Sequence, residues 1–213
     1  MIEKPFMFSI GFTTSSIGGM VALYSIVTLL LETPSGVLAD RWSRKGVMFL
    51  GVGFLLMSAI LFVLSYDVTV FLVSAAFWGA FVAMSSGTYE AVLYDTLVEE
   101  KKTHLFNIYL SRLSIIKGSA YIVAALLGSL VASEYGLRAA GYASIPAIFL
   151  ACIAIYYLKE PKAHKMEVAV PIFMHIRQTF SAVLKVKVLV PIVIIIICYG
   201  LMVSIIGELN QIW

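Results

Sequence analysis

Residues 46–65 read GVMFLGVGFLLMSAILFVLS, twenty consecutive residues without a charged side chain. A helix of that length rises about 30 Å, the thickness of the hydrocarbon core of a lipid bilayer. Five further stretches share this length and apolar character. They are residues 17–39, 69–97, 107–132, 139–158 and 188–207. The sequence therefore predicts an all-α integral membrane protein, a polytopic bundle of about six transmembrane helices.

The composition of the whole chain agrees with a membrane protein. Of its 213 residues, 61% are hydrophobic and 13% are charged, and the mean hydropathy is +0.98. Soluble domains are near half apolar and a quarter charged. The net charge of +3 comes without a basic stripe, so no nucleic-acid partner is expected. Cys152 and Cys198 lack the spacing of a metal or redox motif, and we expect neither a metal nor a cofactor.

The distribution of Lys and Arg among the loops predicts the orientation in the membrane. The loops after the first, third and fifth spans are basic, whereas the alternate loops, residues 66–68 and 133–138, hold one basic residue between them. We therefore expect the basic loops in the cytoplasm and the start of the first span outside. Residues 1–16 contain too short an apolar run to cross, and we interpret them as an outside leader or the remnant of a preceding helix.

The long cytoplasmic loop divides the spans into two groups. Residues 17–158 are expected to form the five-helix part of an N-terminal bundle, and residues 188–213 to contain the first helix of a second bundle. Between them, residues 159–187 carry apolar side chains at helical spacing over 172–184, which predicts an amphipathic helix on the inner membrane face. His175 has no second ligand three or four positions away, so we predict no metal site there.

The first cytoplasmic loop, residues 36–46, carries the most distinctive motif, GVLADRWSRKG. Its glycine and charged positions are Gly36, Asp40, Arg41, Arg44 and Lys45. In physical terms, Gly36 allows a neighbouring helix to approach, Asp40 ends the helix, and the basic residues form a cationic cluster at the membrane surface. The motif resembles the signature loop G-x-L-[AS]-D-[RK]-x-G-[RK]-[RK] between the second and third helices of major facilitator superfamily transporters. Ser43 stands where that family usually has glycine.

Three shorter stretches resemble bacterial members of the same superfamily. They are residues 31–36 (LETPSG), 86–91 (SGTYEA) and 159–161 (KEP). The resemblance implies that the five spans before residue 158 correspond to family helices two to six, that the last span corresponds to helix seven, and that the protein lies in the bacterial inner membrane. A G-x-x-x-G-P motif, frequent in family helix five, is absent between residues 118 and 128, which leaves the direction of transport open.

Five ionisable side chains lie within the predicted spans or at their edges. They are Glu32, Glu90, Asp95, Arg112 and Lys117. Each would cost at least about 2.5 kcal/mol at a lipid-facing midplane, so we expect them to face protein or a water-filled cavity. Counting residues from the cytoplasmic helix ends places Glu90 level with Lys117, and Asp95 level with Arg112. The sequence thus predicts these two ion pairs.

The five charges are expected to serve two kinds of role. Glu90 and Lys117 are candidates for handling substrate or protons, and a static ion pair between them is the alternative. Asp95, Arg112 and Glu32 are expected to be structural or gating charges. For Asp95, the family resemblance implies contact with the arginines of the signature loop, Arg41 or Arg44.

The predicted function is secondary active transport of a small solute across the bilayer, by alternating access and driven by an ion gradient, with the proton as the expected ion. Nucleotide-binding and common hydrolytic motifs are absent and the carboxylates are scattered singly, so we do not expect an enzyme. Two alternatives stay open. One is a truncated or split half-transporter that needs a missing C-terminal half, and the other is a membrane-embedded enzyme or channel.

The orientation can be tested by labelling single cysteines in spheroplasts with a reagent that does not cross membranes. Cysteines at Trp42 and Lys162 should be protected, because both lie in loops predicted to be cytoplasmic, whereas a cysteine at Glu134 should react. The reverse pattern would overturn the orientation.

Overall fold

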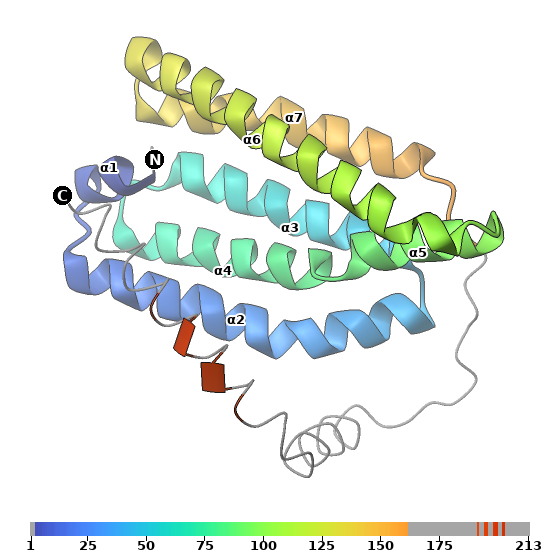
Figure 1. Cartoon of the computed structure of the whole chain (residues 1–213). Coiled ribbons are helices and arrows are strands. Elements are labelled where there is room, and N and C mark those ends of the chain that lie inside the picture. The colour runs from blue at the N-terminus through green and yellow to red at the C-terminus, as the bar shows by residue number, and fades with distance from the viewer. Residues whose placement is uncertain (1–2, 162–190, 192–193, 196–197, 200–201, 203–213) are drawn as a thin grey trace. The chain divides into compact units, whose positions relative to one another are not determined.

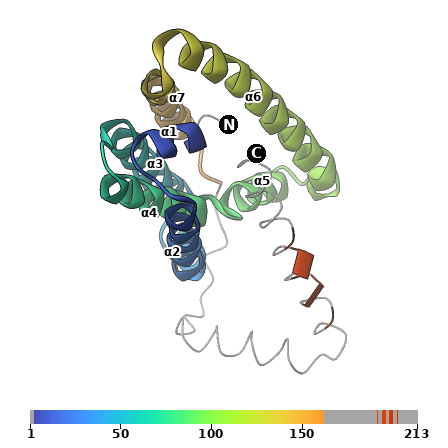
Figure 2. The same cartoon turned by 90° about the vertical axis from the view of Figure 1, so that its left-hand side faces the viewer.

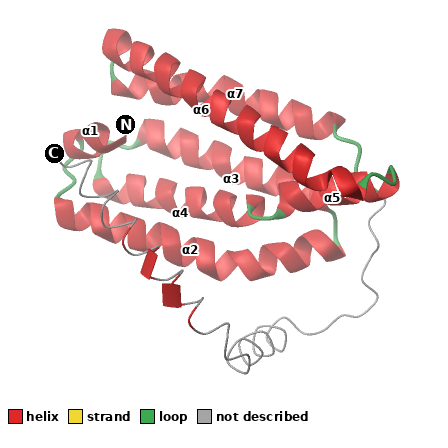
Figure 3. Cartoon of the chain, in the orientation of Figure 1, coloured by secondary structure: helices red, strands yellow, loops and turns green. Residues whose placement is uncertain are grey.

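The computed structural model describes residues 3–161, 191, 194–195, 198–199 and 202. Every element up to residue 157 is helical and belongs to one compact unit (Figure 1). In chain order the elements are α1 (Glu3–Ser9), α2 (Thr14–Arg41), α3 (Arg44–Leu64), α4 (Val68–Ser85), α5 (Thr88–Glu99), the 3₁₀ helix η1 (Thr103–Leu105), α6 (Phe106–Tyr135) and α7 (Leu137–Tyr157). No strand occurs in this part of the chain (Figure 3).

The five spans predicted before residue 158 are confirmed. α2, α3, α6 and α7 are each long and apolar enough to cross a bilayer, and α4 together with α5 forms the fifth such segment. α1 has only seven residues and is too short to cross. The sixth predicted span falls mostly outside the described residues, and the predicted amphipathic helix at 172–184 falls wholly outside them.

The third span is not the uninterrupted helix that its apolar run predicts. α4 ends at Ser85 and α5 begins at Thr88, and Gly87 between them has a φ of +70°. Glycine adopts this left-handed conformation at no steric cost, whereas other residues are strained in it. A hydropathy pattern reports which residues enter the membrane but not where the backbone dihedral angles change. Residues 85–90 read SSGTYE, a short polar stretch that is typical of a turn, but the hydropathy averaged over the whole span conceals it.

Small side chains bring α3 and α4 together. Ser58 of α3 and Ser74 of α4 are both buried, and each hydroxyl donates to the other residue's carbonyl oxygen, at 2.9 Å from Ser58 and 2.8 Å from Ser74. Inside a membrane, lipid is as apolar as a leucine side chain, so helix pairs depend on close packing and interhelical hydrogen bonds. α2 packs on the other side of α4, and α7 packs against α3 (Figures 1 and 2).

Arg138, at the start of α7, holds together the end of the unit that is predicted to face outside. Its guanidinium donates to the carbonyl oxygens of Val63 (2.9 Å) and Ser65 (2.6 Å), where α3 ends. The guanidinium also lies over the ring of Tyr66, 3.9 Å from its centroid, and over the ring of Phe6 at 5.3 Å. Carbonyl groups at a helix C-terminus attract a cation, and aromatic faces do the same. One side chain thus joins α1, α3 and α7.

α6 is covered less than the other spans. None of its thirty residues is buried in the described unit, and it packs mainly along α7, with a smaller contact to α5. Figure 2 shows α6 standing apart from the group formed by α2, α3 and α4. Its apolar surface is therefore available to lipid or to further helices.

Gly79 of α4 provides a test of the packing between α2 and α4. A Cβ atom at this position would lie 2.7 Å from the backbone oxygen of Tyr24, so Gly79→Ala should force the two helices apart and lower the free energy of unfolding by roughly 1–3 kcal/mol. The matched control is Gly53→Ala in α3, where no atom lies within 4 Å of the added carbon and alanine favours the helix. Thermal unfolding in detergent measures both, and equal stability of the two variants would contradict the close contact.

Candidate functional site

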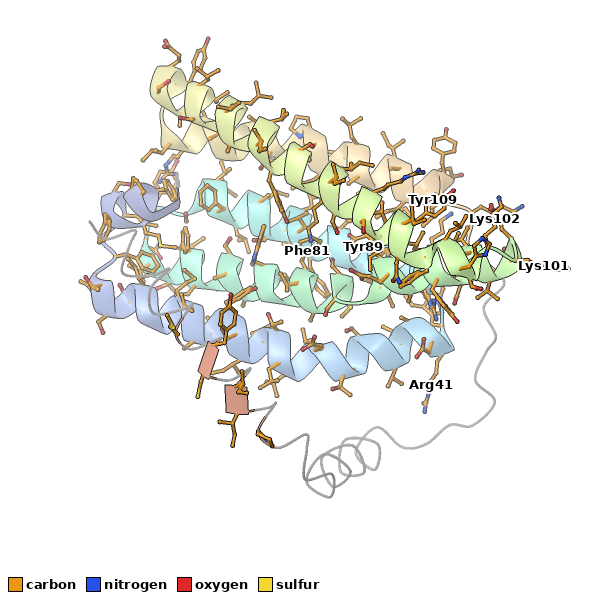
Figure 4. The ribbon with its side chains drawn as sticks, viewed as in Figure 1. Arg41, Phe81, Tyr89, Lys101, Lys102 and Tyr109 are labelled. Carbon is orange, nitrogen blue, oxygen red and sulfur yellow. The ribbon has the colours of Figure 1, made fainter. Side chains whose placement is uncertain are left out.

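Five basic side chains of the unit gather at one end, which we call the basic end and define by Arg41, Arg44, Lys45, Lys101 and Lys102. Figure 4 shows Arg41 at the end of α2, pointing away from the helices, and Lys101 and Lys102 beyond the end of α5. Lys102 donates to the carboxylate of Glu100 at 2.9 Å, and this hydrogen bond raises the pKa of Lys102.

The centre of the basic end is an ion pair between the signature loop and α5. Arg44 Nη1 lies 2.6 Å from Asp95 Oδ2, and Arg44 Nη2 lies 3.6 Å from Asp40 Oδ1. The Arg44 and Asp95 side chains are only 16% and 19% exposed. Neither Arg44 Nη1 nor Asp95 Oδ2 has another hydrogen-bond partner in the described part of the chain, so these two buried atoms depend on each other for compensation. The family resemblance implies contact of Asp95 with Arg41 or Arg44, and the structure shows the contact with Arg44.

Ser43 and Lys45 connect the same loop to the end of α7. Ser43 caps α3, because its hydroxyl accepts from the Gly46 amide at 2.8 Å, and the same hydroxyl donates to Glu160 Oε2 at 2.8 Å. The Lys45 amide donates to Glu160 Oε1 at 3.3 Å, and Lys45 Nζ donates to the Tyr156 carbonyl at 2.7 Å. Serine at position 43 thus supplies a helix cap and a contact to α7 that glycine could not.

Two of the predicted pairings are wrong. No ion pair joins Glu90 to Lys117 in the described residues, and both side chains are exposed on separate helices. Asp95 pairs with Arg44 rather than Arg112, whose guanidinium lies over the Tyr109 ring at 5.5 Å. Counting from helix ends gives the depth of a residue but neither the rotation of its helix nor the distance between helices, and α6 stands apart from α2, α3 and α4.

The prediction for Gly36 is also wrong within this unit. No atom of the described helices lies within 4 Å of a Cβ built on Gly36, so no neighbouring helix approaches there. Its neighbour in sequence, Ser35, is buried against α4, which places Gly36 on a different face of α2. Gly46 has a tighter environment, since an added Cβ would lie 3.0 Å from the Trp42 ring.

Glu32 contacts the break in the third span. The Ser86 hydroxyl donates to Glu32 Oε1 at 2.9 Å, across the interface between α2 and the turn joining α4 to α5. Sequence reasoning placed Glu32 among the structural or gating charges but gave it no partner. The contacts of Glu160 and Tyr156 were missed as well, although a carboxylate directly after the fifth span, on the same membrane face as the basic loop, could have indicated them.

A double-mutant cycle tests the ion pair. Arg44→Gln and Asp95→Asn should each reduce the free energy of unfolding in mixed micelles, and the double variant should lose less than the sum, with a coupling energy of roughly 0.5–3 kcal/mol. The control cycle combines Asp95→Asn with Arg112→Gln. Its two effects should add to within about 0.5 kcal/mol, because the structure places Asp95 against Arg44 instead. Coupling to Arg112 but not to Arg44 would refute this arrangement.

The similarity to a known family extends over both the signature loop and the helices that it joins. The sequence matches the Major Facilitator Superfamily over residues 1–211 of the 213-residue chain. No curated protein matches it. Members of this superfamily are membrane transporters and not enzymes. With a match over almost its entire length, and with five apolar helices that could cross a bilayer, the chain belongs to the Major Facilitator Superfamily.

Proposed function

We propose that the protein is a secondary active transporter that moves a small solute by alternating access, with the proton as the coupling ion. The observation that carries this proposal is the ion pair between Arg44 and Asp95, which joins the signature loop to α5 at the basic end. Alternating access requires contacts at one end of a bundle that can open and close while the binding site stays near the midplane. A partly exposed ion pair between two helices is suited to such a gate, since water can replace each partner when the helices separate.

The basic end has a second set of contacts that would move together with the first. Glu160 binds both Ser43 and the Lys45 amide, and Lys45 reaches α7 through the Tyr156 carbonyl. The signature loop thereby contacts α5 on one side and the end of α7 on the other. We infer that the loop positions the inner ends of several helices as one body, so that its movement opens or closes this end of the bundle.

Lys117 and Glu90 are the residues proposed to handle substrate or protons. Each lies in an apolar segment that could cross the membrane, and no ion pair in the described unit neutralises either of them. An intramembrane charge that lacks a fixed partner is costly unless it faces a hydrated cavity or meets a mobile ion or solute. An ammonium group favours a substrate with an anionic or strongly polar group, and a carboxylate favours a cation or a proton.

The remaining proposals concern the organisation and location of the transporter. Residues 17–158 would form most of an N-terminal bundle, and residues 188–213 would begin a second bundle after the cytoplasmic loop at 159–187. The exposed surface of α6 is compatible with contacts to helices beyond this unit. Resemblance of residues 31–36 and 86–91 to bacterial members favours the bacterial inner membrane. Because the proposal is an ion-driven transporter, no ATP-binding partner is required.

Uptake into proteoliposomes tests the function and the role of Lys117. The full-length protein should accumulate at least one solute from a panel of radiolabelled anions, zwitterions and cations when a proton gradient is imposed, and a protonophore should abolish this accumulation. Lys117→Met should raise the half-saturating solute concentration by roughly tenfold or more, because a hydrogen bond to a charged group contributes about 1.5–3 kcal/mol.

The matched control for this assay is Lys101→Gln, which removes a lysine outside the membrane spans and should leave uptake unchanged. Accumulation that persists with protonophore would exclude proton coupling. Unchanged uptake by the Lys117→Met variant would remove that residue from the binding site.

A further inference from the structure

One face of α7 packs along α3, and we call this contact the α3–α7 seam (Figures 1 and 2). The residues of this face follow one another at intervals of three, seven, four and three positions, which places them on one side of a helix. They are Arg138, Gly141, Ile148, Cys152 and Ile155. The seam therefore includes a charged residue, a glycine and apolar side chains in a fixed order along the helix.

Apolar side chains form the middle and inner part of the seam. Ile148 and Ile155 of α7 are buried in one cluster with Met48 and Val52 of α3. Cys152 of α7 packs against the same cluster. This part of the seam is thus held by close packing of side chains from both helices.

Hydrogen bonds fix the seam at the basic end. Lys45, at the start of α3, donates through Nζ to the Tyr156 carbonyl oxygen at 2.7 Å. Ser43, which caps α3, donates to the carboxylate of Glu160 at 2.8 Å. The inner ends of the two helices are therefore joined by polar contacts as well as by packing.

At the opposite end, the backbone of α7 lies directly against the last turn of α3. A Cβ atom built on Gly141 would lie 2.8 Å from Cγ2 of Val63 and 2.9 Å from the ring of Phe62. Both distances are shorter than an ordinary contact between carbon atoms. The absence of a side chain at Gly141 therefore permits this approach.

Arg138, one turn before Gly141, supplies the donors that the end of α3 lacks. α3 ends at Leu64, so no further turn of this helix can bind the carbonyl groups of Val63 and Ser65. The Arg138 guanidinium donates to both carbonyl oxygens, at 2.9 Å and 2.6 Å. One side chain of α7 thus completes the hydrogen bonding of α3.

The contacts at the two ends of the unit differ in their access to water. The Arg44 and Asp95 side chains at the basic end are 16% and 19% exposed, so water can replace each partner when they separate. Val63 and Ser65 are only 2% and 0% exposed, so separation there would leave buried carbonyl groups without a donor. The basic end therefore suits a contact that opens, and the opposite end suits one that stays closed.

We propose that Arg138 is a positioning residue of the transporter, which fixes α7 on the end of α3 so that the α3–α7 seam stays closed throughout transport. The proposal rests on the proposed transport function. α3 and α7 then move as one body, and the surfaces that separate during alternating access lie elsewhere. The task requires arginine, because a planar guanidinium binds two carbonyl oxygens while it stacks on the Tyr66 ring, and an ammonium group cannot.

Thermal unfolding in detergent tests the requirement for a guanidinium without any substrate. Arg138→Lys and Arg138→Gln should both lower Tm, by roughly 4–10 °C. The matched control is Arg112→Lys, which should change Tm by less than about 2 °C, because Arg112 is exposed and its guanidinium lies over the Tyr109 ring at 5.5 Å. A Tm of Arg138→Lys equal to that of the unchanged protein would overturn the requirement.

Spin labels separate positioning from general stability. One pair, at Leu64 on α3 and Tyr142 on α7, reports on the Arg138 end of the seam, and a second pair, at Phe49 and Ile153, reports on the inner end. All four positions are exposed, and the native cysteines are replaced by alanine. Arg138→Gln should widen the distance distribution of the first pair and leave that of the second unchanged. Widening of both pairs, or of neither, would overturn the positioning role.

A reversible cross-link tests whether the seam opens during transport. The Cβ built on Gly141 lies 2.8 Å from Val63 Cγ2, close to the roughly 3 Å between a Cβ atom and the partner sulfur of a disulfide. Val63→Cys with Gly141→Cys should therefore form a disulfide on oxidation with copper phenanthroline. Uptake into proteoliposomes should stay within about twofold of that of the reduced form. Each single-cysteine variant, oxidised in the same way, is the control.

Uptake that stops on oxidation and returns on reduction would refute a permanently closed seam. If the double-cysteine variant does not fold, the distance between labels at Leu64 and Tyr142 answers the same question, since it should not shift when a solute gradient is imposed. Failure of every reduced form to accumulate any solute would refute the proposed transport function instead. The unfolding and distance measurements need no transport, so they would still decide the role of Arg138.

Discussion

Backbone groups inside a bilayer have no water to bind, and this constraint decides where the spans of this protein can be interrupted. The third span breaks at a glycine with left-handed geometry, and hydroxyls of Ser35 and Thr88 take over the carbonyl groups at the end of α4. The same shortage of hydrogen-bond donors explains why Ser58 and Ser74 exchange hydrogen bonds between α3 and α4. Serine and threonine side chains in these helices therefore stabilise the fold by binding backbone carbonyl groups, a role that the composition of the sequence does not indicate.

The charges of the unit are sorted by depth. At the basic end, Arg44, Asp95 and Glu160 form contacts among loop and helix ends, where lipid headgroups and water moderate the cost of separating a pair. Farther along the spans, Glu32, nine residues before Arg41, accepts a hydrogen bond from Ser86, and Lys117 has no ion-pair partner in the described residues. In the transporter that we propose, the ion pair at the basic end would serve as a gate, and the charges without an ion-pair partner would meet ions or solutes.

Much of the fold could be predicted from the sequence, because a span is defined by length and hydropathy and both are properties of a continuous stretch. The ends of α2, α3, α6 and α7 lie within three residues of their predicted positions. The break at Gly87 was not predicted in this way, because hydropathy averaged over a span conceals the short polar stretch at residues 85–90. The rotation of each helix about its axis could not be predicted either. Depth alone therefore suggested a pair of Asp95 with Arg112, whereas the structure pairs Asp95 with Arg44.

The contacts of Arg138 have a consequence for the order in which the unit assembles during synthesis. The Ser65 carbonyl, which it binds, lies 73 residues earlier in the chain. The turn between α3 and α4 is therefore synthesised long before Arg138. Its carbonyl groups lack this guanidinium donor until α7 has been inserted. Once bound, Arg138 is held by carbonyl oxygens and aromatic rings. A basic residue on the side predicted to face outside is thereby tolerated, because the folded chain itself provides the environment for its charge.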